Sequence, residues 1–231
     1  MTLRQALVAS AVLLTTLLVL PGHGAASPLL AALVASGCWA VGARWVAAQL
    51  PDRGPGPADL VTIARGTLTC AAAGLVVAGP HPALLPLCVL ALALDAVDGP
   101  VARRTGTSSA FGRRFDGEAD AFLMLVLSAA VAVHGHAWVV VLGLLRYAFG
   151  AAGRALPWLR RPLPVRWWRK VATGVSGTVL VVALAEVLPG PATTALLLVA
   201  LALLGESFGR DVLWLWRRRT PVAALSPVGR P

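Results

Sequence analysis

Residues 95–120 read DAVDGPVARRTGTSSAFGRRFDGEAD and include four aspartates, in a chain of 231 residues that has only 10 acidic residues. The chain is 58% hydrophobic and 13% charged, so no segment could form a separate soluble domain. Charge close to a bilayer costs free energy unless a function requires it. The composition therefore predicts one membrane domain, and the aspartates mark a candidate functional site within it.

The spacing of the aspartates predicts two pairs, each on one face of its own helix. Asp95 and Asp98 are three positions apart, and Asp116 and Asp120 are four apart. Carboxylates that converge in a low-dielectric setting repel strongly, so cations are expected between them. No His or Cys lies in the cluster, and oxygen ligands favour magnesium or manganese over zinc. Magnesium also binds substrate phosphate, so the cluster predicts phosphoryl transfer on a diphosphate.

The complete pattern is D-x2-D-G-x2-A-R-x8-G-x3-D-x3-D, and it resembles the signature of the CDP-alcohol phosphatidyltransferase family. A chance run of loop charges would not keep eight residues at set gaps. The two glycines are positions where the backbone is expected to approach a ligand closely. The fixed positions are Asp95, Asp98, Gly99, Ala102, Arg103, Gly112, Asp116 and Asp120.

The resemblance covers about residues 59–216 and implies a six-helix membrane enzyme, a CDP-alcohol phosphotransferase. Such an enzyme passes the phosphatidyl or a similar group of a CDP-linked lipid to an alcohol and releases CMP. The resemblance also implies a homodimer and two magnesium ions, with manganese as an alternative, at Asp95, Asp98 and Asp116. Asp120, a further candidate metal ligand, would be the general base on the acceptor hydroxyl. The residues expected around the nucleotide and its diphosphate are Gly99, Ala102, Arg103, Gly112, Thr62 and Arg65.

Thr62 and Arg65 belong to a second element that resembles the family. The series D-L-V-T-I-A-R from Asp59 is similar to the N-x-x-T-x-x-R start of the first core helix, with aspartate in place of asparagine. Arg65 would either bind substrate phosphate or extend along the helix to reach the interface.

Apolar runs predict eight membrane helices, since each run is near the length that crosses about 30 Å of hydrocarbon. The predicted fold is therefore all-α and polytopic. Residues 51–216 form the six-helix core, 1–50 add about two N-terminal helices, and 217–231 form a basic cytoplasmic tail. The first run is alternatively a signal peptide cleaved near residue 26. The runs lie at about 5–21, 28–48, 60–79, 83–98, 117–133, 137–153, 171–188 and 193–209.

Charge predicts the orientation of these helices. If the N-terminus is cytoplasmic, none of the four outer loops contains Lys or Arg, as the positive-inside rule expects. The aspartates then lie at the cytoplasmic face, and the composition favours a bacterial plasma membrane. The net charge of +10 is explained by topology and anionic lipids, so no nucleic-acid partner is expected.

Three cations are candidates for binding a phosphate on the acceptor. Arg146 lies within an apolar run, where a lone guanidinium is costly, so it is expected to face a polar cavity. With Arg154 and Lys170 it partly resembles the phosphatidylglycerophosphate synthase branch, from which Arg169, Ala172 and Ser176 depart. Glycerol 3-phosphate is the favoured acceptor, and inositol phosphate or another alcohol used in the same family is the alternative. The other arginines between 160 and 169 are interpreted as a loop that serves topology.

Two other classes of function are possible from the acids alone. A cation transporter or channel explains carboxylates at helix ends, but not the fixed positions of Gly99, Ala102 and Arg103. A non-catalytic relative of the family is disfavoured because the signature is complete.

Overall fold

The structure, a computed structural model, describes residues 2–19, 27–50, 54–106, 109–161, 163–164 and 166–219. Within these ranges the side chains of residues 18–19, 98–100 and 102–103 are not described. The predicted tail beyond residue 219 and the predicted cleavage region at 20–26 therefore lie outside the described residues. The same holds for the side chains of Asp98, Ala102 and Arg103 and for the surroundings of Gly99.

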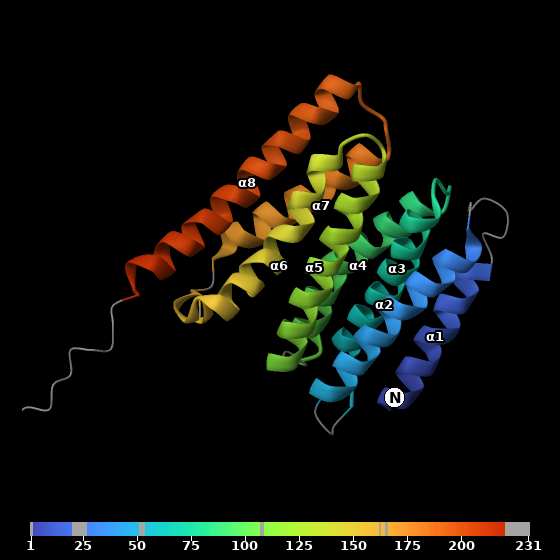
Figure 1. Cartoon of the computed structure of the whole chain (residues 1–231). Coiled ribbons are helices and arrows are strands. Elements are labelled where there is room, and N and C mark those ends of the chain that lie inside the picture. Colours follow the sequence, from blue (N-terminus) through green and yellow to red (C-terminus); the bar gives the residue numbers. More distant parts are fainter. Residues whose placement is uncertain are drawn as a thin grey trace, which may run out of the picture.

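The described residues form eight α-helices and no strand, which confirms the predicted all-α class. The helices run up and down through the molecule, with α1 and α2 at one edge and α8 at the other (Figure 1). The short 3-10 turns η1 (Ala137–Val139) and η2 (Pro157–Arg160) flank α6. The helices are α1 (Leu3–Val19), α2 (Pro28–Gln49), α3 (Pro57–Ala78), α4 (Leu84–Arg104), α5 (Ala110–Val133), α6 (Val140–Ala155), α7 (Trp167–Leu184) and α8 (Gly190–Arg217).

Four segments of the described chain are long and apolar enough to cross a membrane. They correspond to α2, α3, η1 with α6, and α8, while α1 and α4 contain shorter apolar segments. Helix α5 begins with a charged half and becomes apolar only after Asp120. Together these helices make the protein a polytopic helical membrane protein.

Helix α3 forms the centre of the packing. It contacts α1, α2, α4 and α5, and its middle segment from Thr67 to Leu75 is buried throughout. Small side chains let the neighbouring helices approach closely, as is common in membranes. A Cβ atom on Gly74 would overlap the carbonyl oxygen of Ala31 and lie 3.0 Å from the Ala35 Cβ. Glycine at this position therefore permits α2 to pack directly on α3.

Helices α4 and α5 are longer than the apolar runs that predict them. Helix α4 continues to Arg104 and α5 already begins at Ala110, where the Ser109 hydroxyl caps it by accepting from the Gly112 N–H (2.9 Å). Hydropathy reports where a chain is apolar, whereas backbone hydrogen bonds and caps set helix ends. Both halves of the aspartate motif are therefore helical, and a short connection joins them.

Candidate active site

Three of the four motif aspartates converge between α4 and α5. Asp95 comes from α4, and Asp116 and Asp120 lie one turn apart on α5. One carboxylate oxygen from each lies within 4.8 Å of the other two. The side-chain position of Asp98 is not described, but its place on α4 is one turn beyond Asp95.

Arg65 of α3 lies among these carboxylates. Its side chain is fully buried, and its guanidinium pairs with Asp95 and with Oδ1 of Asp120 (3.0 Å). Its Nη2 also donates to Asp116, at 2.9 Å to the carboxylate and 3.3 Å to the main-chain oxygen. The guanidinium therefore points to the aspartates and does not extend to the interface. A role in binding substrate diphosphate stays a prediction.

The charges at this cluster fit a hard divalent cation. Three carboxylates against one buried guanidinium leave an excess of two negative charges. The aspartate side chains are 33–42% exposed, so they can be reached from the cavity described below. Oxygen-only ligands of this kind suit magnesium or manganese. Asp95, Asp116 and Asp120 are thus the described residues that could hold such an ion.

The start of α3 packs against the start of α5 beside this cluster. Asp59 accepts from the Gly56 N–H (2.8 Å), and its carboxylate lies 3.1 Å from where a Cβ of Gly112 would be. Glycine at 112 therefore lets the two helix ends approach, and a ligand role for it is untested. Thr62 is buried and donates to the Ala58 carbonyl (3.1 Å). It does not line the cavity next to the aspartates.

A cavity of about 740 Å³ brings the predicted anionic and cationic residues together. The described aspartates form one wall on α4 and α5. The other walls come from α6, α7 and α8. All three predicted acceptor-binding cations line it: Arg146 and Arg154 on α6, and Lys170 in the first turn of α7.

Arg146 has a partner that the sequence reasoning missed. Its Nη2 donates to Oε1 of Glu118 on α5 (2.8 Å), and both side chains are about half exposed. Glu118 lies between Asp116 and Asp120 in the sequence. Because it is two residues from each, it projects from a different side of α5, and this spacing distinguishes it from the aspartates of the motif. The mid-helix arginine faces a polar cavity, as predicted, and remains accessible to a ligand.

Arg169 is a second residue that the sequence reasoning missed. As one of the arginines between 160 and 169 it is predicted to serve topology alone, yet it lines the cavity and its Nε lies 3.1 Å from Oδ2 of Asp211. Asp211 is buried on α8, and Arg166 also approaches it, at 3.8 Å. An acidic residue such as Asp211 within a mostly apolar helix needs a cationic partner, and this could have predicted its pair with Arg169.

Comparison with known proteins agrees with this geometry. The model of the CDP-alcohol phosphatidyltransferase family matches residues 57–205, which run from the first residue of α3 into α8. No curated protein and no solved structure matches the chain. The matched segment contains the described aspartate cluster and most of the residues that line its cavity, and it covers more than half of the sequence. The chain therefore belongs to the CDP-alcohol phosphatidyltransferase family, whose members transfer a phosphatidyl group from a CDP-alcohol to an alcohol.

Proposed function

We propose that this protein transfers the phosphatidyl group of CDP-diacylglycerol to glycerol 3-phosphate and releases CMP, as a step of phospholipid biosynthesis. The reaction takes place at the cytoplasmic face of a bacterial plasma membrane. One observation supports the proposal most directly: carboxylates suited to a divalent cation and cations suited to a phosphate line the same cavity.

The reaction requires one bond to form and one to break. The acceptor hydroxyl oxygen attacks the phosphorus that carries the lipid, and the bond from that phosphorus to the CMP oxygen breaks, so that CMP leaves with the bonding electrons. Asp120 takes the hydroxyl proton as general base. Asp95, Asp98 and Asp116 would hold two magnesium ions, which supply electrostatic stabilisation to the diphosphate.

The chain positions these groups before substrate arrives. Asp116 and Asp120 project from one face of α5, and Arg65 fixes both carboxylates through the two ends of its guanidinium. Fixed charges of this kind need little rearrangement during the reaction. Arg65 thus acts as a positioning residue for the carboxylates.

The cationic wall supports a phosphorylated acceptor. Arg146, Arg154 and Lys170 line the same cavity as the aspartates, and guanidinium and ammonium groups are the usual ligands of phosphate. An acceptor without phosphate, such as serine, would leave these cations without a ligand in the cavity, apart from the pair of Arg146 with Glu118. Inositol phosphate is the second candidate, since it offers the same phosphate.

The test is CMP release by the purified protein from CDP-diacylglycerol with magnesium. Separate reactions contain glycerol 3-phosphate, inositol phosphate, serine or no acceptor, and Asp116→Asn is the inactive control. We expect rapid release only with glycerol 3-phosphate. Preference for serine would contradict the acceptor assignment. A cation transporter would release no CMP with any acceptor, and that result would overturn the proposed function.

A further inference from the structure

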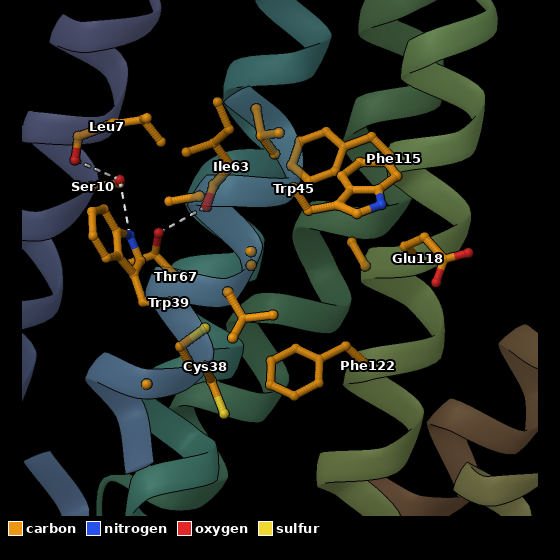
Figure 2. A pocket seen from close by; sticks show the side chains of 18 of the residues that line it. Leu7, Ser10, Cys38, Trp39, Trp45, Ile63, Thr67, Phe115, Glu118 and Phe122 are labelled. Carbon is orange, nitrogen blue, oxygen red and sulfur yellow. Dashed lines mark hydrogen bonds between the residues drawn. The ribbon is translucent and has the colours of Figure 1, made fainter. Parts of the chain in front are cut away.

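A second cavity, of about 630 Å³, lies on the other side of α5 (Figure 2). Helices α2 and α5 both pack on α3 and leave a groove between them, with Ile63, Gly66 and Thr67 of α3 as its floor. Residues of α1 and α2 form much of its wall. These two helices precede residue 57, where the match to the family begins. The cavity is therefore built partly by an element that the family core does not include.

The wall of this cavity is almost entirely apolar. The polar groups of Ser10, Trp39 and Thr67 in this wall have partners within the protein, as Figure 2 shows. The Trp39 indole N–H donates to the Ser10 hydroxyl (3.1 Å), which donates to the Leu7 carbonyl (2.9 Å). The Thr67 hydroxyl donates to the Ile63 carbonyl (2.8 Å). A ligand here would meet hydrocarbon surface and no open hydrogen-bonding group on these side chains.

The apolar cavity is the neighbour of the aspartate cavity. Helix α5 separates them: Phe115, Ala119 and Phe122 line the apolar side, while Asp116 and Asp120 line the polar side. Two residues line both cavities, Glu118 of α5 and Tyr147 of α6. A molecule with a charged head and an apolar chain could therefore occupy both.

The two ends of the groove differ. Trp45 stacks on Phe111 and Phe115, with ring centroids 6.1 and 6.0 Å away, and these rings cover the end near the start of α5. Cys38 and Phe122 lie at the opposite end in Figure 2. Along α2 the edge is formed by Leu33 and Val41, which are 62% and 70% exposed. The groove thus opens sideways, where a chain can enter from the bilayer.

We infer that this groove binds one hydrocarbon chain of the CDP-linked lipid donor, so that the N-terminal helices α1 and α2 select the length of that chain. The inference rests on the proposed function, because it takes the diphosphate to lie at the aspartates. A chain that leaves bilayer hydrocarbon for protein hydrocarbon gains little from transfer alone. Selection therefore comes from shape: a chain too long for the groove overpacks it.

Gly37 offers a way to shorten the groove without disturbing the backbone. It lines the cavity next to Cys38, and a Cβ added to it would meet no atom within 4 Å. Leucine at this position fills the far end, and leucine favours helix more than glycine does. Gly205→Leu is the matched control, since Gly205 on α8 also has open space around it and lines neither cavity.

The experiment compares CDP-diacylglycerol with two hexadecanoyl chains and with two octanoyl chains, using CMP release by purified protein. Overpacking an apolar site costs about 1–3 kcal/mol, which corresponds to a loss of roughly five- to hundredfold. We expect Gly37→Leu to lower kcat/KM by that factor for the long donor only, and Gly205→Leu to change neither. Equal effects of Gly37→Leu on both donors, or none on either, would overturn the inference while leaving the proposed function standing.

A binding measurement separates this inference from the reaction itself. CDP-diacylglycerol with a photoactivatable diazirine at one chain terminus is irradiated with the Asp120→Asn protein, which lacks the proposed base, and the labelled peptides are identified by mass spectrometry. Labels on α2 and on the Phe122 segment of α5 are expected, with a decrease in Gly37→Leu. Labels confined to α7 and α8 would overturn the inference. Absence of CMP release from any donor in the native protein would instead count against the proposed function.

Discussion

At the scale of single residues, replacing one carboxylate oxygen of a motif aspartate by an amide nitrogen is expected to have the largest effect on activity. Asp95→Asn or Asp116→Asn should abolish turnover while the helical fold persists, because a neutral amide is a far poorer ligand for a hard dication than a carboxylate. Chelation by EDTA should do the same to the native protein. CMP release and circular dichroism measured on the same samples test this. Full activity in chelator would contradict a role for a divalent cation.

Arg65 gives a prediction about stability. Its fully buried guanidinium pairs with three aspartates, so Arg65→Gln leaves those carboxylates to repel each other. Breaking a buried ion pair costs about 3–5 kcal/mol, and the lower end is expected because the aspartates are partly exposed. The thermal unfolding midpoint in detergent should fall, and magnesium should restore more of it in Arg65→Gln than in the native protein. An unchanged midpoint in magnesium-free buffer would contradict this account of Arg65.

Arg146 and its partner Glu118 allow two roles to be distinguished. If Arg146 binds the acceptor phosphate, Arg146→Leu should raise the acceptor KM about tenfold or more, since a charge-assisted hydrogen bond contributes about 1.5–3 kcal/mol. The KM for the CDP-lipid should barely change. Glu118→Gln releases the guanidinium, so it should lower the acceptor KM or leave it unchanged. If both variants raise it equally, the ion pair itself is what matters and the phosphate role is wrong.

At the scale of helices, close contacts at glycine determine how the elements fit. A Cβ on Gly143 of α6 would overlap the Ser128 hydroxyl and lie 2.5 Å from the Leu125 Cα on α5. Gly143→Ala must therefore push α6 away from α5, at a cost of about 2 kcal/mol. Gly205→Ala, with open space around it, should be neutral or slightly stabilising. Unfolding midpoints of the two variants in detergent provide the measurement, and equal midpoints would contradict this packing argument.

The helices also show which features a sequence can reveal. Apolar runs predict the eight helices that the structure describes, of which four segments are long and apolar enough to cross a membrane. The spacing of Asp116 and Asp120 places them correctly on one face of α5. The polar ends of α4 and α5 could not be read from hydropathy, because the Ser109 cap, not apolarity, sets where α5 begins. The partners of Arg146 and Arg169 were missed for a different reason. Which acid a cation meets depends on how α5 approaches α6 and how α7 approaches α8, and residue spacing within one helix does not contain that information.

At the scale of the whole molecule, charge divides the helical bundle into two ends. The connections α3–α4, α5–η1 and α7–α8, at residues 79–83, 134–136 and 185–189, contain no Lys or Arg. They lie together at one end in Figure 1, and the connection between α4 and α5 lies at the other. The aspartate cluster lies toward that other end, in the second half of α4 and the first half of α5. Positive residues prefer the cytoplasmic side, so this end should face the cytoplasm.

Labelling of single cysteines with a membrane-impermeant maleimide tests this orientation directly. The parent protein for this test carries Cys38→Ala, which removes the one cysteine that is not buried. Cys70 and Cys88 stay in place because they are buried. Val187, which is 70% exposed in the α7–α8 connection, and the exposed Arg114 near the start of α5 are each replaced by cysteine. Val187→Cys should react in intact cells, whereas Arg114→Cys should react only after permeabilisation. The reverse pattern would place the aspartates outside the cytoplasm, away from any pool of nucleotide-activated lipid. The parent protein is the control: because it should stay unlabelled, either result comes from the introduced thiol.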